Sequence, residues 1–402
     1  MNRVLFICGL YSPNPSANGV CVIRLQEVFL ERGINSDVIC IGDKPNTIGS
    51  NKYGNCYFIQ GPQKNSKNSF NALFQKAIHF FSWPIIRESM KSYELAIKNM
   101  VENNDYDLVV AVCQPVTAAY ACAKYCKNEF ILYELDSITN VPDTLHGIKK
   151  LLKGRVDRIE RFIYDKASYI FHTKCDQKYY EKPKYDKYRI KWEFTDIPHL
   201  VRHGQSFDKN FLSNKEKSIA YTGLLTKERN DPEYFLKLII SLSKKMSVKA
   251  YFTTHGDCEE LLQYYHNKHP NVIIPLGFVS FEELQEIRKK SCAFISLGLR
   301  YGGEVTSVQS KVFEYMSTGK QIIHINGSKN DVEKDYLKEY GNALLLDRNT
   351  DFDTNVNELF SFLSEVKILD VNSVRKAFPM NTPEWTVERM IDYKIKKNGK
   401  KE

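Results

Sequence analysis

Residues 310–320 read S-K-V-F-E-Y-M-S-T-G-K and run straight into the apolar segment Q-I-I at 321–323. The spacing puts Lys311 and Glu314 on one face of a short helix, which Gly319 ends just before a buried strand. A carboxylate can accept hydrogen bonds from both ribose hydroxyls of a sugar nucleotide, while an ammonium and the positive end of a helix can bind its diphosphate. Taken alone, Lys311 and Glu314 fit an ordinary solvated ion pair on a surface helix better. The surrounding sequence therefore has to decide between the two interpretations.

Length and composition predict two domains, and the sequence also predicts an intracellular protein. The chain has 402 residues, of which 43% are hydrophobic, and this is enough to bury two ordinary cores. No window approaches the roughly 20 apolar residues that span a bilayer, and Met1-Asn2-Arg3 leads into a strand rather than a signal peptide. The ten cysteines include no C-x-x-C pair, so we expect reduced core residues rather than disulfides or a zinc site. These features predict a cytoplasmic protein.

The net charge of +9 suits an anionic partner. Sugar nucleotides, anionic lipid headgroups and nucleic acid all qualify by charge alone. The sequence has no zinc-finger spacing, no RNA-binding aromatic signature and no compact basic recognition helix. We therefore expect no nucleic-acid partner.

Strand-like apolar runs alternate with helix-like periodic segments, which predicts parallel sheets covered by helices on both faces. The first series begins with a strand at 4–8, a helix at 20–32 and a strand at 36–41. The second series has strands at 218–221, 248–253, 272–274, 293–296 and 321–325. A polar linker at 210–217 separates them. We expect an N-terminal domain at 1–205, a C-terminal domain at 206–380, and an amphipathic helix with a basic tail at 381–402.

Residues 310–320 resemble the P-S-K-x-x-E-Y-x-x-x-G-K-P segment of group-1 (family 4-like) glycosyltransferases. The opening V-L-F-I-C at 4–8, Y-S-P at 11–13 and Asn18-Gly19 resemble that family's first strand and glycine-containing loop. The resemblance implies the α/β fold called GT-B. In it, two Rossmann-like domains with parallel sheets face each other across a cleft, and a C-terminal helix crosses back to the N-terminal domain. It also implies that Glu314 holds the ribose of the donor, while the turn and helix start around Ser310 face its diphosphate. We expect the Lys311 ammonium to bind that diphosphate as well.

One loop departs from the family pattern. Residues 221–229 read Y-T-G-L-L-T-K-E-R where the family has G-R-x-x-x-x-K-G, so Gly223 matches the glycine but Leu224 replaces the Arg. Lys227 and Arg229 are close enough in sequence to supply the lost charge to the diphosphate and the departing nucleotide. The alternative, that both are ordinary exposed loop cations, is equally consistent with the sequence.

Two further segments resemble donor-binding parts of the family. Gly256, in T-H-G-D at 254–257, matches a glycine turn, whose role is more structural than direct contact with the donor. The P-L-G-F-V-S segment at 275–280 places Val279 where the family's backbone reads the edge of the base, although Ser280 with Glu283 is also a plain capping box.

A second departure precedes residue 310. Many relatives carry a Glu seven residues before the ribose-binding one, but Ser307 occupies that position here and the nearest carboxylate is Glu304. We expect the glycine loop at 302–303 and the amides near Ser307 to face the sugar, with Glu304 binding a hydroxyl.

In the first domain, the candidate residues are Gly19, in a loop near the donor phosphate and the acceptor, and Asp136. Asp136 resembles the acidic residue of the family's H-D turn, although Leu135 replaces the His. Asp136 or Glu134 could orient or deprotonate an acceptor hydroxyl. A plain turn at Gly19 and a helix-capping role for either carboxylate remain alternatives.

Residues 70–83 indicate a partner. Phe70, Phe74, Ile78 and Phe81 fall on one helical stripe, with lysines upstream, as an in-plane interfacial helix requires. A core helix explains the stripe equally well. We therefore expect a membrane surface as a candidate partner, at the inner face of the cell membrane.

The resemblance implies a metal-independent, retaining glycosyltransferase. It would move a sugar from a nucleoside-diphosphate sugar to a hydroxyl of a glycan or lipid-linked glycan, in surface polysaccharide biosynthesis. No cofactor is expected. The departures at Leu224 and Ser307 leave two alternatives: a non-catalytic GT-B subunit that stabilises a partner transferase, and a sugar-nucleotide epimerase.

Overall fold

The computed structural model describes residues 1–12, 15–42, 45–61, 78–139, 148–201, 215–300, 308–328 and 331–398. The chain divides into two compact units, which are Met1–His199 with Met380–Glu402 (unit 1) and Leu200–Pro379 (unit 2). Within the described residues, no helix combines the length and apolar character that crossing a membrane requires. Glu304, Ser307 and most of the stripe predicted at 70–83 lie outside the described residues.

Unit 1 is built on an eight-stranded sheet in the order β3-β4-β2-β1-β5-β6-β7-β8 among the described residues. All neighbouring strands are parallel except β3 and β4. The strands are β1 Arg3–Leu10, β2 Asn35–Ile41, β3 Thr47–Asn51, β4 Gly54–Ile59, β5 Leu108–Cys113, β6 Phe130–Glu134, β7 Tyr169–Thr173 and β8 Trp192–Thr195. The β3–β4 hairpin was not predicted, because Thr47–Asn51 is a polar, mostly exposed edge strand without an apolar run.

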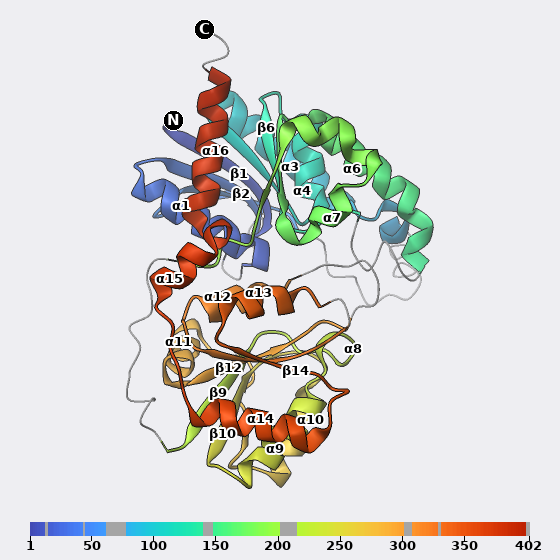
Figure 1. Ribbon diagram of the computed structural model, residues 1–402. Helices are drawn as coiled ribbons and strands as arrows, with labels where there is room; N and C mark the ends of the chain where they lie inside the picture. Colours follow the sequence, from blue (N-terminus) through green and yellow to red (C-terminus); the bar gives the residue numbers. More distant parts are fainter. Residues whose placement is uncertain are drawn as a thin grey trace. The chain divides into compact units, whose positions relative to one another are not determined.

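Helices cover both faces of this sheet (Figure 1). They include α1 Ala17–Glu31, α3 Arg87–Asn103, α4 Val116–Tyr125, the 3-10 helix η1 Ile148–Leu152, α6 Lys153–Lys166, η2 Lys174–Asp176, α7 Gln177–Tyr180, η3 Pro183–Lys191 and α16 Pro383–Asn398. Because strand side chains alternate, Leu5 and Ile7 join the core under α3 and α4, whereas Phe6 packs edge-on against Phe29 of α1 at 6.0 Å. The C-terminal helix α16 packs on α1, where Arg32 pairs with Glu388 at 2.8 Å.

Unit 2 has a six-stranded, fully parallel sheet in the order β11-β10-β9-β12-β13-β14 among the described residues. Its strands are β9 Lys217–Thr222, β10 Val248–Thr253, β11 Ile273–Pro275, β12 Ala293–Leu297, β13 Gln321–Ile325 and β14 Ala343–Leu346. Its helices are α8 Lys227–Asn230, α9 Glu233–Ser243, α10 Glu259–Lys268, α11 Phe281–Lys290, α12 Ser310–Met316, α13 Glu333–Tyr340, α14 Phe352–Ser364 and α15 Val371–Ala377. The 3-10 helix η5 Pro379–Asn381 spans the point at which the chain returns to unit 1.

In both units, the strand order reverses beside the first strand of the series. The reversal lies between β1 and β5 in unit 1 and between β9 and β12 in unit 2. Ligands of open parallel sheets bind outside the carboxyl ends of the strands at such a switch point. Candidate sites are therefore to be sought near the carboxyl ends of β1 and β5 in unit 1 and of β9 and β12 in unit 2.

Candidate functional site

A pocket of about 270 Å³ lies at the carboxyl ends of β9, β10 and β11 in unit 2. It brings together five of the residues predicted to bind the donor: Gly223, Val279, Ser310, Lys311 and Glu314. The other residues lining it are Thr222, Thr253, Thr254, His255, Gly277, Phe278, Leu284 and Arg288.

Tyr315 fixes helix α12 to the end of β9. Its hydroxyl accepts a hydrogen bond from the Thr222 N–H at 3.0 Å and donates to the Thr222 carbonyl at 3.3 Å. Its ring stacks on Phe294 of β12, with ring centroids 4.5 Å apart and an interplanar angle of 6°. Tyr315 therefore fixes the position of α12 at the end of β9, with Lys311 and Glu314 at the pocket.

Gly319 and Lys320 also have structural roles. Gly319 has φ +71°, and its carbonyl accepts from the Leu369 N–H at 2.8 Å, so a side chain there would meet the Leu369 backbone. The buried Lys320 ammonium donates to three carbonyls at 2.6–2.8 Å around the end of α11, those of Arg288, Lys289 and Ser291. Lys320 thus satisfies carbonyls that the helix end leaves unpaired.

Arg288 is a pocket residue that sequence reasoning missed. Its guanidinium donates to Glu314 at 2.6 Å and to the Thr222 hydroxyl at 3.2 Å, and its Nε is buried without a partner among the described residues. The signal was present in the capping box at Ser280, which starts α11 and puts Leu284 and Arg288 four residues apart on one helical face. Nothing in the sequence, however, indicated that this face meets Glu314.

The Lys311 side chain is poorly solvated, which disfavours its charged form. Its ammonium donates to the Tyr221 hydroxyl and lies 4.0 Å from the centroid of that ring. Burial lowers the pKa of Lys311 to about 7, although the charges of Glu333 and Glu314 act in the opposite direction. Gly223, with φ +114°, approaches this ammonium, since a Cβ at Gly223 would lie 3.7 Å from it. Near neutral pH, Lys311 is therefore ready to take up a proton when an anion arrives.

The turns after β10 and β11 depend on glycines. Gly256 has φ +130° and pairs with Leu225 in an isolated parallel bridge, where a side chain would meet the Leu225 carbonyl. Gly256 does not line the pocket. The turn after β11 contains Gly277, with φ +66°, and carries the exposed Phe278 ring and Val279 to the pocket edge.

Neither Lys227 nor Arg229 lines this pocket. The Lys227 N–H donates to the Asp257 carboxylate at 2.8 Å, and the Arg229 carbonyl accepts from the Arg300 N–H at the same distance. Their predicted role at the diphosphate stays a prediction.

A buried polar cluster lies at the ends of β12 and β13. His324 is 3.1 Å from Asp331, and Glu333 accepts from the Ser296 hydroxyl at 3.0 Å and from the Gln309 N–H at 2.9 Å. The ligand atoms of His324, Asp331 and Glu333 lie within 4.8 Å of one another, as a metal site would require. Because the three side chains hold each other and Gln309, the N-cap of α12, hydrogen bonding already accounts for the cluster.

Unit 1 has its own pocket, of about 430 Å³, at the carboxyl ends of β1, β5 and β6. Its lining consists of Gly9, Leu10, Ser16, Ala17, Asn18, Ile41, Ile86, Gln114, Pro115 and Asp136. The Asn18 side-chain amide donates to Asp136 at 3.2 Å, and burial followed by the Glu134 charge raises the pKa of Asp136.

Glu134 and Gly19, close to this pocket, form hydrogen bonds that stabilise the local backbone. Glu134 is buried and accepts from the Ile138 N–H at 2.9 Å and from the Tyr164 hydroxyl at 2.5 Å. Gly19 lies in the first turn of α1, where its N–H donates to the Ser16 hydroxyl at 3.2 Å and a side chain would meet the Leu10 carbonyl.

No protein-family model matches the chain, and no curated protein matches it. Solved structures match over nearly its whole length. A lipopolysaccharide outer core galactosyltransferase, WaaB, is 13% identical over 98% of this chain and 99% of its own, with a TM-score of 0.53. Anabaena HepE in complex with UDP-glucose is 11% identical over 97% and 99%, with a TM-score of 0.57. A UDP-N-acetylglucosamine 2-epimerase is 14% identical over 99% and 97%, with a TM-score of 0.55. At these identities the likeness shows the fold, which is the α/β GT-B fold of two Rossmann-like units.

Proposed function

We propose that the protein is a glycosyltransferase. It moves a sugar from a nucleoside-diphosphate sugar to a hydroxyl of a glycan or lipid-linked glycan, in surface polysaccharide biosynthesis. The observation that carries the proposal is the meeting of Glu314, Lys311 and Arg288 at a pocket outside the carboxyl ends of β9 and β10. Neighbours named for sugar transfer, among them a galactosyltransferase of the lipopolysaccharide outer core, support the same reading.

In this proposal, the pocket binds the nucleotide of the donor. Glu314 accepts hydrogen bonds from the ribose hydroxyls, and Arg288, whose guanidinium lies 2.6 Å from the Glu314 carboxylate, orients it. The Phe278 ring and the backbone at Val279 meet the base, because an exposed aromatic ring at a pocket edge offers a stacking surface.

Lys311 and Arg288 stabilise the leaving diphosphate. Negative charge grows on the diphosphate as the bond to the sugar breaks, and cations held in a poorly solvated place interact with it more strongly than they would in water. Among the described residues that line the pocket we recognise no enzymic nucleophile, so we propose same-face attack assisted by the departing phosphate, without a metal. Lys227, Arg229 and Glu304 remain proposed contributors.

Asp136 is the proposed base for the acceptor. It lines the pocket of unit 1, and its raised pKa brings the carboxylate closer to the range in which a general base works. A lipid-linked acceptor would bring the protein to the inner face of the cell membrane.

Titration calorimetry of UDP, GDP and dTDP against the wild type and Glu314→Gln tests donor binding. Losing charge-assisted hydrogen bonds of roughly 1.5–3 kcal/mol each should raise the nucleotide Kd at least about tenfold. Glu282→Gln, an exposed carboxylate at the start of α11, is the matched control and should leave Kd unchanged. An unaltered Kd in Glu314→Gln would remove the ribose assignment.

Turnover assays then distinguish a transferase from an epimerase and from a non-catalytic subunit. A transferase releases nucleoside diphosphate from its donor, faster when an acceptor is present. Interconversion of sugar nucleotides without nucleotide release would instead identify an epimerase. Binding without any turnover would identify a non-catalytic subunit.

A further inference from the structure

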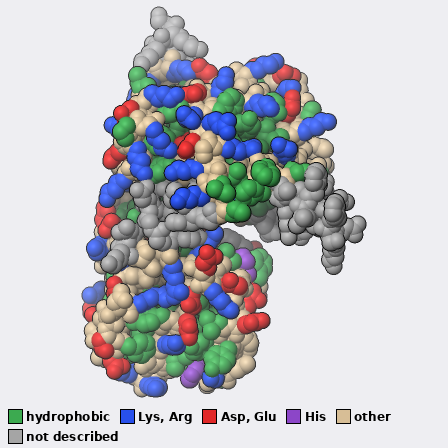
Figure 2. All heavy atoms as spheres, turned by 90° about the vertical axis from the view of Figure 1, so that its right-hand side faces the viewer, with side chains coloured by type: hydrophobic (Ala, Val, Ile, Leu, Met, Phe, Trp, Pro, Cys, Tyr) green, Lys and Arg blue, Asp and Glu red, His purple; other side chains and the backbone are tan. Residues whose placement is uncertain are grey.

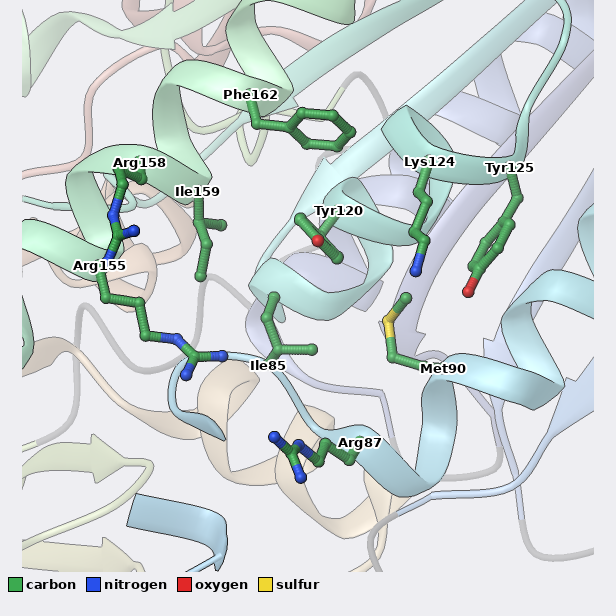
Figure 3. A pocket seen from close by; sticks show the side chains of 10 residues that line it. All are labelled: Ile85, Arg87, Met90, Tyr120, Lys124, Tyr125, Arg155, Arg158, Ile159 and Phe162. Carbon is green, nitrogen blue, oxygen red and sulfur yellow. The ribbon is translucent and has the colours of Figure 1, made fainter. Parts of the chain in front are cut away.

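Unit 1 contains a third hollow, of about 650 Å³, between helices α3, α4 and α6 (Figure 3). Its floor is apolar and aromatic, with Ile85, Met90, Tyr120, Tyr125, Ile159 and Phe162. Four cations line it as well, namely Arg87, Lys124, Arg155 and Arg158. In Figure 3 the side chains of Ile85, Tyr120 and Ile159 lie between Lys124 on one side and Arg155 with Arg158 on the other. This hollow is distinct from the pocket that contains Asp136.

Three cations of the hollow, Arg87, Arg155 and Arg158, lie close enough for their charges to repel one another. None of the four forms an ion pair with a carboxylate among the described residues. Burial lowers the pKa of Arg155, and the nearby charges of Arg87 and Arg158 lower it further. Bringing like charges together costs free energy that a bound anion would recover.

Large apolar side chains close to these cations are exposed to solvent. Phe81, Ile148 and Leu151 are 63%, 70% and 81% exposed. Ile148 and Leu151 lie three residues apart in the 3-10 helix η1, so they share one face. Arg155 joins these segments to the hollow, since its guanidinium donates to the Phe81 carbonyl and its helix α6 follows η1 directly.

Further cations border this apolar rim. Lys149 lies 5.0 Å from the centroid of the Trp83 ring, and Lys150 and Lys153 are exposed. In Figure 2, which views the side on which α6 lies in Figure 1, hydrophobic side chains of unit 1 are bordered by Lys and Arg. A surface that binds only a soluble anion does not need exposed Leu and Phe next to its cations, whereas a bilayer surface needs both.

We propose that this hollow and its rim dock on an anionic lipid bilayer. A lipid phosphate enters the hollow among Arg87, Arg155 and Lys124, while Phe81, Ile148 and Leu151 enter the boundary between headgroups and acyl chains. The surface differs from the stripe predicted at 70–83, with which it shares Phe81. It does not depend on the sugar-transfer proposal, because lipid binding is measured without donor or acceptor.

Vesicle co-sedimentation of the full chain tests this surface. The probes are phosphatidylcholine vesicles with and without added phosphatidylglycerol, whose headgroup is anionic. The wild type should bind the anionic vesicles, less so as salt is raised. The variant Arg87→Glu/Arg155→Glu should bind them at least about tenfold more weakly, since each cation near an anionic surface contributes severalfold to affinity. Phe81→Ser/Leu151→Ser should also weaken binding, at unchanged net charge.

Lys244→Glu/Lys268→Glu is the matched control, because it makes the same charge change at the C-terminal ends of helices α9 and α10 of unit 2. It should keep wild-type binding, and thermal melts should show all variants folded. Wild-type protein that stays in the supernatant would overturn the proposal. Equal losses in the control and in Arg87→Glu/Arg155→Glu would show general charge attraction and also overturn it. Full release of bound protein by a few millimolar glycerol phosphate, with no effect of Phe81→Ser/Leu151→Ser, would identify a soluble-phosphate site instead.

Discussion

Binding of the donor should be coupled to uptake of a proton by Lys311. The Lys311 ammonium is buried against the Tyr221 ring, which brings its pKa down to about 7. A diphosphate placed beside it stabilises the charged form, so the pKa in the complex rises toward the ordinary lysine range. Above pH 7, the Lys311 side chain is therefore mostly neutral in the free protein and protonated in the complex.

The size of the effect follows from these two pKa values. At pH 8, about 0.9 of the free Lys311 side chains are neutral, so binding should take up about 0.9 proton per nucleotide sugar. Below pH 6 the uptake should fall to about 0.1 proton. If only the charged form binds, affinity should decrease roughly 15-fold between pH 7 and pH 8.5.

Calorimetry in buffers of different ionisation enthalpy measures the uptake directly. Lys311→Arg is the matched control, since a guanidinium stays charged throughout this pH range and should bind without proton uptake. Lys311→Met should bind weakly at every pH. If the wild type binds at pH 8 with less than about 0.2 proton taken up, Lys311 either keeps its charge in the free protein or does not meet the diphosphate.

Three further outcomes follow from particular contacts. Gly223→Ala should lower stability by about 1–2 kcal/mol, because φ +114° is strained for a residue with a Cβ; an unchanged melting temperature would contradict this. Lys320→Met should cost about 3 kcal/mol or more by leaving three carbonyls unpaired, and Lys290→Met serves as its exposed control in thermal melts. Burial, followed by the Glu134 charge, raises the pKa of Glu160 to about 8. The protonated Glu160 carboxyl therefore contributes stability that is complete below the pKa of Glu160 in the unfolded chain and is lost as pH rises toward 8. Glu160→Gln should flatten the decline in melting temperature between pH 5 and 8, and an identical pH profile would refute the assignment.

The sequence predicted the fold because the fold depends on local periodicity. Apolar runs such as 4–8 and 321–325 had to be buried on both faces, and helices between them impose parallel pairing. The comparisons confirm this α/β GT-B architecture. The edge hairpin at 47–59 was missed because an exposed strand carries no such pattern. The assignment to group 1 stays a prediction, since no family model matches.

For the site, the sequence by itself determined which side chains share a face. Helical spacing put Lys311 beside Glu314, and the glycine at 256 marked a turn that comes after a strand. Only the tertiary structure decided what those faces meet. It brought Arg288 to Glu314 from 26 residues away, lowered the pKa of Lys311 by burial, and gathered the cations of the third hollow from α3, α4 and α6. The physical reason is that backbone periodicity fixes the direction of a side chain, whereas its partners and its solvation depend on the path of the whole chain.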